Sequence, residues 1–157
     1  MQRIDQALFD QVAQQAEQSP RRRRNHNLHK EADLVQRFVN VLQPGTYVRP
    51  HRHLREIAGT GFECFVVLQG AIGLILFDGE GEACRWEKLE ATGPLRGIEL
   101  EEGTYHSLVA LSRDAVMLEI KQGPYNPSTD KDFIARYPAE GTAEAQDLVA
   151  KWASLFV

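Results

Sequence analysis

Residues 45–53 read GTYVRPHRH and contain two histidines, His51 and His53, separated by one residue. In an extended strand every second side chain points to the same face. The two imidazoles are therefore expected to project together, with Tyr47 and Arg49 on that side as well. Two imidazoles in this arrangement can chelate one divalent ion. An H-x-H pair also arises by chance on a solvated surface, so a metal site requires further ligands from elsewhere in the chain.

Two glycines, a glutamate and a third histidine stand at regular distances around this pair. Five residues separate Gly45 from the first histidine, and Glu63 opens the next apolar run with six residues between it and Gly70. His106 follows Gly103 by three positions, at the start of a later apolar run. The candidate metal ligands are His51, His53, Glu63 and His106.

These spacings resemble the first motif of the cupin superfamily, G-x5-H-x-H-x3,4-E-x6-G. Both glycines, the histidine pair and Glu63 match it, but nine residues, not three or four, precede Glu63. Glu56 lies nearer to the pair, yet only Glu63 keeps the six-residue spacing to Gly70. We therefore expect residues 54–61 (LREIAGTG) to form a loop at the mouth of a barrel.

The second cupin motif, G-x5-P-x-G-x2-H-x3-N, is matched less completely. Gly103 and His106 follow Gly97, whereas Glu101 stands at the proline position and Ala110 at the asparagine position. Neither replaced residue is a metal ligand in the family. The two departures concern the geometry of a turn and the polarity of the pocket.

More narrowly, the chain is similar to the WbuC-type cupin fold metalloproteins of bacteria over roughly residues 20–141. The resemblance implies a double-stranded β-helix, or jelly-roll, barrel with one metal ion inside. It also implies a connection with surface-polysaccharide (O-antigen) metabolism, without a settled reaction. The stretches that carry it are RRRRNHNLH (21–29), PGTYVRPHRH (44–53), FVVLQG (65–70), GTYHSLVAL (103–111) and KQGPYNPSTDKDF (121–133).

Three imidazoles and one carboxylate suit Zn, Fe, Mn, Ni or Co and are poor ligands for Ca or Mg. An ion with five or six ligands would keep one or two positions open, where it could polarise a substrate or activate water or O2. Zn would more readily remain four-coordinate and closed. The ligand set alone does not choose between these ions.

The periodicity of the rest of the chain predicts a mainly β fold between two helices. Apolar residues recur at helical spacing over residues 3–17 and 143–156. Eight short runs of strand character lie between them, with a tight-turn signal at DGEGE (78–82). We expect three parts within a single structural domain, namely a helix and basic link (1–30), a β-barrel (31–123) and a C-terminal loop and helix (124–157).

Several expected strands are apolar on both faces, so something must cover the outside of the barrel. The terminal helices or a second subunit, in a homodimer, are the available covers. The net charge of -4 argues against a nucleic-acid partner, and no apolar run is long enough for a membrane span. Cys64 and Cys84 lie in apolar runs without metal-knuckle spacing and are expected to be buried thiols of a cytoplasmic protein.

Other residues are candidates for acid/base catalysis or ligand binding near the metal. Glu119 and Lys121 share one face of a late strand and could act as an acid/base pair in the cavity, or form an ion pair on an edge strand. Arg49 is expected to point toward the metal and bind an anionic ligand or pair with Glu63 or Glu119. Tyr47, Tyr105 and Tyr125 could donate hydrogen bonds to a ligand, although each residue type is also common at a barrel rim.

The run Arg21–Arg24 is either an anion site, for a phosphate or a nucleotide-sugar, or a solvated basic link. His26 and His29 could form a second metal site or simply make hydrogen bonds. Two functional hypotheses follow. The first is a small metal-dependent enzyme, an isomerase, epimerase or dioxygenase, that acts on a polar, anionic or sugar-like molecule. The alternative is a metal-containing protein that binds or senses a ligand without turnover, and a purely structural metal is a third hypothesis.

Overall fold

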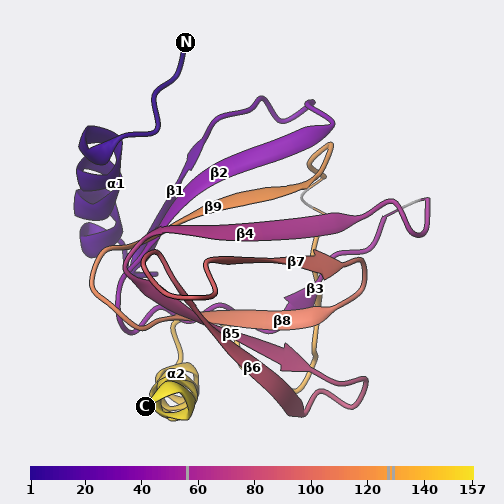
Figure 1. The fold of residues 1–157 in the computed structure, drawn as a ribbon. Helices are drawn as coiled ribbons and strands as arrows, with labels where there is room; N and C mark the ends of the chain where they lie inside the picture. Colours follow the sequence, from indigo (N-terminus) through magenta and orange to yellow (C-terminus); the bar gives the residue numbers. More distant parts are fainter. Residues whose placement is uncertain (56, 127, 129) are drawn as a thin grey trace.

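The computed structural model describes the chain from residue 1 to 157 except for residues 56, 127 and 129. Two five-stranded antiparallel sheets face each other, with strand orders β1-β2-β9-β4-β7 and β10-β3-β8-β5-β6 (Figure 1). The mainly β prediction is therefore confirmed. The strands are β1 (Arg23–Asn27), β2 (Val35–Leu42), β3 (His51–Arg52), β4 (Phe62–Gln69), β5 (Ala71–Phe77), β6 (Ala83–Glu90), β7 (Gly97–Glu101), β8 (Tyr105–Ala110), β9 (Ala115–Gln122) and β10 (Asp132–Phe133).

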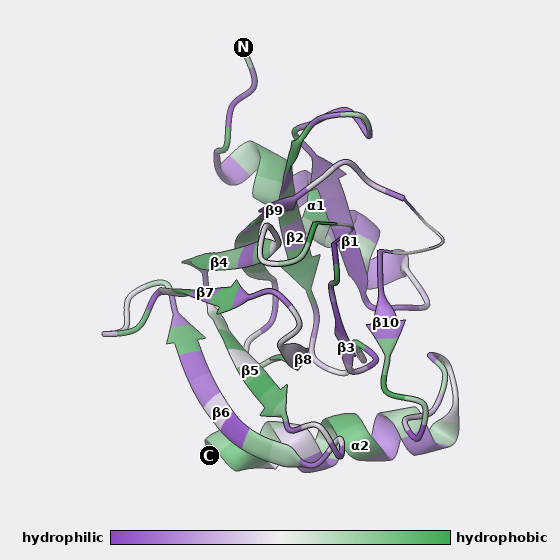
Figure 2. Cartoon of the chain, turned by 90° about the vertical axis from the view of Figure 1, so that its right-hand side faces the viewer, coloured by the Kyte–Doolittle hydropathy of each residue, from purple (hydrophilic) through white to green (hydrophobic). Residues whose placement is uncertain are grey.

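Alternation along the strands divides the side chains between the inside of the barrel and its outer surface. On β4, Glu63, Phe65 and Val67 are buried, while the residues between them are only half-buried. On β5 every second residue faces inward and packs with Leu108, whereas Ile75 faces outward and is also fully buried. A strand that is apolar on both faces needs a cover on the outside, and β5 is mostly green, that is hydrophobic, in Figure 2.

The C-terminal helix α2 (Ala143–Ala153), followed by the 3-10 turn η1 (Ser154–Phe156), supplies this cover on the second sheet (Figure 1). Thr142 caps the helix by accepting a hydrogen bond from the backbone of Ala145 at 3.2 Å. Trp152 packs against the outward face of β5 and β8. Gly73 of β5 allows this close approach, because a Cβ there would lie 2.4 Å from the ring of Phe156.

The N-terminal helix α1 (Gln6–Gln18) covers the first sheet. Asp5 caps it by accepting from the backbone of Leu8 at 3.1 Å, and the buried face of the helix carries Val12 and Ala16. This face packs on three strand valines from β2 and β9. They are Val39, Val41 and Val116. Both terminal helices thus serve as covers, and no helix of the described chain is long and apolar enough to cross a membrane.

Two parts of the chain differ from the sequence-based expectation. The basic link is in fact β1, which pairs with β2 along its whole length and is hydrophilic because it faces a polar cavity (Figure 2). Within residues 46–53, only His51–Arg52 form a strand. The C-terminal segment expected as a loop ends in β10, which pairs with β3 beside the histidines.

The tight turn predicted at residues 78–82 joins β5 to β6, where Gly81 donates its backbone N–H to Asp78 at 3.0 Å. The prediction that both thiols are buried is wrong. Cys64 is half-buried on the outer side of β4, and Cys84 is exposed on the edge strand β6, although both are free. Sequence periodicity alone did not show which face of each strand stays uncovered.

Candidate metal centre

Three of the four predicted ligands, the histidines, cluster inside the barrel, and Glu63 lies against two of them. His51 on β3 lies directly opposite His106 on β8 in the register, and their ring centroids are 4.6 Å apart. His53 follows β3 immediately, with its ring centroid 5.0 Å from that of His51. One ring nitrogen from each histidine lies within 4.8 Å of those of the other two. Glu63 approaches from β4 in the facing sheet, with Oε2 3.1 Å from Nε2 of His106 and 3.5 Å from Nε2 of His53.

Backbone carbonyl groups orient all three imidazoles. Nδ1 of His51 lies 2.9 Å from the carbonyl oxygen of Arg49, and Nδ1 of His106 lies 3.0 Å from that of Thr104. Nδ1 of His53 contacts the carbonyl oxygen of Asp130. A carbonyl only accepts, so each Nδ1 must carry the proton, which leaves each Nε2 with a free lone pair. Histidines that bind a metal are held in this way.

The site is closed to solvent except through the barrel. The four side chains belong to residues that are between 2% and 7% exposed. Among the residues that the structure describes, His53 Nε2 and Glu63 Oε2 are buried without a hydrogen-bond partner. Buried polar atoms without partners are rare in folded proteins and call for an explanation such as an ion. The donor set therefore fits a divalent cation between the imidazole nitrogens and the carboxylate.

The electrostatics of the site are those of a cation-binding centre. Burial, followed by the charges of Lys131 and His106, keeps the pKa of His51 well below its usual value, so this ring is neutral. Burial by itself raises the pKa of Glu63, but His106 and His53 outweigh it and hold that pKa well below the usual range. Burial disfavours the charged form of His106, yet Glu63 more than compensates and raises the pKa of His106. A metal ion bound at Nε2 of His106 would compete with protonation of this ring.

A buried ion pair lies next to the candidate ligand His53. Lys121 Nζ on β9 lies 3.1 and 2.9 Å from the two carboxylate oxygens of Asp130, and both residues are buried. The backbone carbonyl of Asp130 also accepts a hydrogen bond from His53 Nδ1. The Lys121–Asp130 ion pair therefore connects the C-terminal segment to a candidate ligand. The sequence analysis did not single out Asp130. Its only signal was its place in the stretch 121–133.

Glu119 lies on the same inner face of β9, as the alternation predicted. Its Oε2 accepts a hydrogen bond from Asn40 Nδ2 at 2.7 Å. Burial, with the nearby Glu63 charge, raises the pKa of Glu119 to about 7, so the carboxyl group can hold or release a proton near neutral pH. Lys121 is paired with Asp130, and an acid/base role for Glu119 and Lys121 stays a prediction.

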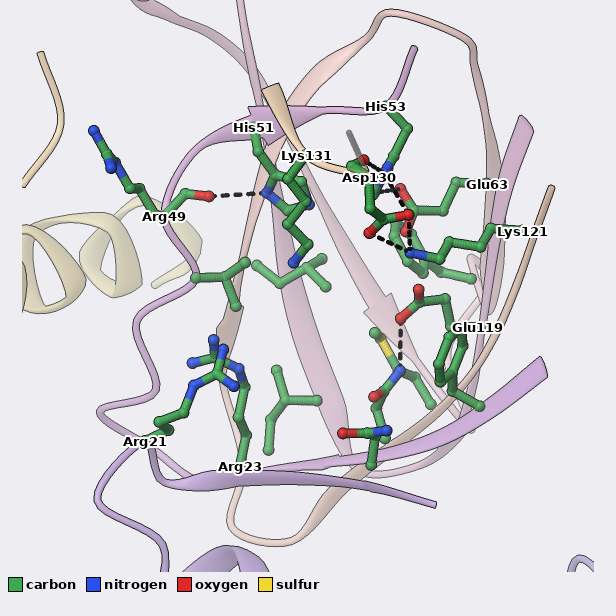
Figure 3. Close-up of a pocket in the computed structure, with 18 of the residues that line it drawn as sticks. Arg21, Arg23, Arg49, His51, His53, Glu63, Glu119, Lys121, Asp130 and Lys131 are labelled. Atoms are coloured by element: carbon green, nitrogen blue, oxygen red, sulfur yellow. Dashed lines mark hydrogen bonds and ion pairs between the residues drawn. The ribbon is translucent and has the colours of Figure 1, made fainter. Parts of the chain in front are cut away.

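Three predicted ligand-binding residues lie elsewhere than expected. The Arg49 guanidinium stacks over the ring of Phe133 at 4.9 Å and points away from the histidines (Figure 3). Tyr47 is buried against α2, where its hydroxyl donates to the carbonyl of Pro138 at 3.0 Å. Tyr105 donates to Asp132 at 3.1 Å and does not line the cavity. Arg49 and Tyr47 differ because residues 46–50 are not in a strand, so alternation does not extend back from His51. Tyr105 precedes His106 on β8, so the two side chains face opposite sides of the strand.

The centre lies in a cavity of about 600 Å³ that is open at one side. Phe65, Leu108 and Met117 form an apolar part of its wall. Tyr125 and three arginines of the N-terminal run also line the cavity, namely Arg21, Arg23 and Arg24. His29 also lines the cavity, with Nδ1 2.8 Å from the carbonyl oxygen of Arg37. In the described part of the chain, the only cluster of potential ligands is that of His51, His53 and His106, so a second metal site at His26 and His29 is not supported.

Barrel and site together define a cupin-fold protein, and solved structures agree. The capsular polysaccharide assembling protein CapF from Staphylococcus aureus matches with a TM-score of 0.56 and 19% identity, over 69% of this chain and 29% of that one. KdgF from Halomonas sp. matches with a TM-score of 0.50 and 18% identity, over 68% of this chain and 83% of that one. An oxalate decarboxylase from Bacillus subtilis matches with a TM-score of 0.52 and 15% identity, over 71% of this chain and 28% of that one.

The chain belongs to the family described as "Domain of unknown function (DUF6016)", whose model matches residues 4–89. That match includes β1 to β5, three of the four candidate ligands and most of β6. The chain spans less than a third of the length of CapF. No curated protein has a sequence similar enough to match.

Proposed function

We propose that the protein binds one divalent transition metal through His51, His53, His106 and Glu63 and acts on a small polar or anionic molecule in the cavity. The observation that supports this most directly is the orientation of the imidazoles. All three Nδ1 atoms are committed to carbonyl oxygens, and the remaining lone pairs converge on a carboxylate. The identity of the ion stays open among Zn, Fe, Mn and Ni.

A bound metal would supply Lewis-acid activation of a coordinated oxygen. Glu119 would hold or accept a proton within the same cavity, since its pKa of about 7 matches the requirement of a general acid or base at neutral pH. Asn40 orients this carboxyl group. The apolar wall formed by Phe65, Leu108 and Met117 limits the water around the reacting group.

A role in surface-polysaccharide metabolism belongs to this proposal, with a sugar derivative as substrate. It is supported by the resemblance to WbuC-type proteins and by the fold shared with a capsular polysaccharide assembling protein. Free Cys64 and Cys84 are typical of a reducing compartment, so we place the protein in the cytoplasm. A homodimer remains part of the proposal because the outer side of β4 is only half-buried.

The test is the metal content of the purified protein, measured by inductively coupled plasma mass spectrometry. We expect about one transition-metal ion per chain, and its loss by tenfold or more in His51→Ala and His106→Ala, because each variant removes one of four ligands. His26→Ala, on β1 outside the site, is the matched control and should keep the metal. A wild-type protein without bound metal after reconstitution, or a His26→Ala variant that loses it equally, would contradict the proposal.

The alternative function is ligand binding without turnover. The polar cavity fits both functions, and the Glu119 carboxyl group in its wall, held by Asn40 at 2.7 Å, is the specific observation that favours the enzyme. A screen of sugar derivatives against the metal-loaded protein separates the two. A ligand that binds and is recovered unchanged would favour the binding protein, whereas conversion that is lost in Glu119→Gln would favour the enzyme.

A further inference from the structure

The wall of the cavity next to the metal centre carries an excess of positive charge. Five cationic side chains reach it from the N-terminal run, from the segment before β3 and from the segment before β10. They are Arg21, Arg23, Arg24, Arg49 and Lys131. Among the residues that the structure describes, Glu140 is the only carboxylate in ion pairs with any of them, and it is shared between Arg21 at 2.7 Å and Arg23. This excess lies in a chain whose net charge is -4.

Lys131 is the cation of this wall that points into the middle of the cavity (Figure 3). Lys131 and Phe133 line the cavity, whereas Asp132 between them pairs with Arg52 at 2.7 Å and does not line it. β10 pairs with β3, so the Lys131 backbone is held next to the metal ligands. Lys131 is accessible through the cavity, and no described residue forms an ion pair or hydrogen bond with its ammonium group.

Two other cations that line the cavity are already paired within the protein, and the carboxyl groups of Glu63 and Glu119 lie in the same cavity without a Lys or Arg partner among the described residues. Lys121 is paired with Asp130, and Arg23 donates to the carbonyl of Tyr47 at 2.7 Å and to Glu140. Arg23 is thus a fixed positive charge, only 16% exposed at its side chain, on the far side of Lys131 from His51 in Figure 3. A cation without a partner in a confined space is unfavourable, and an anionic ligand would remove that cost.

We propose that the cavity binds a small ligand through an oxyanion, a carboxylate or a phosphate ester, that pairs with Lys131 next to Arg23 while another oxygen of the same ligand faces the metal centre. The proposal rests on the proposed function in taking this cavity as the ligand site. It assigns recognition to Lys131 instead of Arg49, which the sequence favoured but which stacks on Phe133. A cavity of about 600 Å³ is large enough for a molecule of sugar size.

The experiment uses isothermal titration calorimetry of the full chain with three probes of similar size: gluconate, glucose 6-phosphate and glucose. We expect at least one anionic probe to bind more tightly than glucose, and the tighter of the two identifies the anion as a carboxylate or a phosphate. Lys131→Met should weaken anion binding about 10- to 100-fold, as expected for loss of a hydrogen bond to a charged group. Lys131→Arg should stay within severalfold of wild type.

The matched control is Lys88→Met, which removes the same charge from β6, where Lys88 pairs with Glu90 at 3.0 Å outside the cavity. Lys88→Met should bind as wild type does. Lys131→Met should also unfold at no lower temperature than wild type, because the replaced charge has no partner in the described protein. This rules out misfolding as the cause of lost binding.

Metal content and titrations with and without prior chelation separate this proposal from the metal proposal. A protein that contains no metal but still binds an anion through Lys131 would overturn the metal proposal and leave the anion subsite intact. Anion binding as tight in Lys131→Met as in wild type would overturn the subsite. So would glucose binding as tightly as both anions, or the absence of any anion binding at millimolar concentration.

Discussion

At the scale of single residues, hydrogen bonds and burial support a metal-binding role for the H-x-H pair, which is a weak signal in the sequence alone. The H-x-H pair was equally compatible with a solvated surface, but His51 and His53 are each held at Nδ1 by a carbonyl and buried. Asp130 contributes twice, with its carbonyl to His53 and with its carboxylate to Lys121. This second role can be tested by stability measurements.

Asp130→Ala is expected to lower the free energy of unfolding by about 3–5 kcal/mol, because it leaves the buried Lys121 ammonium without its partner. The double variant Lys121→Met with Asp130→Leu should recover most of that loss, since it removes both charges. The measurement is chemical denaturation of the metal-free protein, so that altered metal binding does not contribute.

Asp132→Ala, two residues later, is the matched control for that variant. It breaks a pair with Arg52 in which both side chains are partly exposed, and such a pair contributes about 0–1 kcal/mol. Equal losses in the two single variants would contradict a specific role for the Lys121–Asp130 pair.

At the scale of elements, a side chain from another part of the chain holds the backbone of the loop 54–61. The Glu102 carboxylate, at the end of β7, accepts backbone hydrogen bonds from Arg55 at 2.8 Å, Gly59 at 2.7 Å and Gly61 at 2.9 Å. These bonds, that of Gly61 first, lower the pKa of Glu102. One half-buried carboxylate thereby holds a loop that the sequence showed only as an extended gap in a motif.

The lowered pKa sets the direction of a pH effect. A carboxyl group whose pKa is lower in the folded protein stabilises the fold above the usual glutamate pKa of about 4.3 and loses this effect as the pH falls through the folded value. Hydrogen exchange of the Gly59 and Gly61 amides should therefore be protected near neutral pH and lose protection in acid. Glu102→Gln should exchange severalfold faster at neutral pH, while Glu101→Gln should not. Unchanged protection in Glu102→Gln would rule out the clamp.

At the scale of the whole molecule, the two sheets place ligands from both sides of the barrel around one point. His51, His53 and His106 come from one sheet and Glu63 from the other. An ion bound to all four would link the two sheets. Metal binding should therefore be coupled to the stability of the entire fold.

Addition of the native metal at a hundred times its Kd should stabilise the protein by about 2.7 kcal/mol. For a chain of this length that corresponds to a rise in Tm of about 5–10 °C. Differential scanning calorimetry of chelated and reconstituted protein measures it. His51→Ala should show no rise, and a rise of the same size in that variant would place the metal elsewhere.

Much of the fold and of the candidate ligand set could be predicted from the sequence, because both depend on local spacing. Strand alternation over residues 63–68 and 71–77 indicated strands with two apolar faces, and capping residues at Asp5 and Thr142 now explain where the helices begin. Four ligand types at spacings close to a known motif are likewise a property of the chain alone. Spacing favours Glu63 over Glu56, and the structure describes Glu63 beside the histidines, whereas Glu56 lies outside the described residues.

The tertiary structure alone decided which residues surround that centre. β1 and β10 form because their backbones pair with β2 and β3. Their mostly polar side chains do not predict these pairings from the sequence. The same pairings bring Arg23, Asp130 and Lys131 to the cavity. Tyr47 packs against α2 and Arg49 stacks on Phe133 away from the histidines, because the chain before His51 is not a strand. Local spacing determines which side chains share a face, and long-range pairing determines what that face meets.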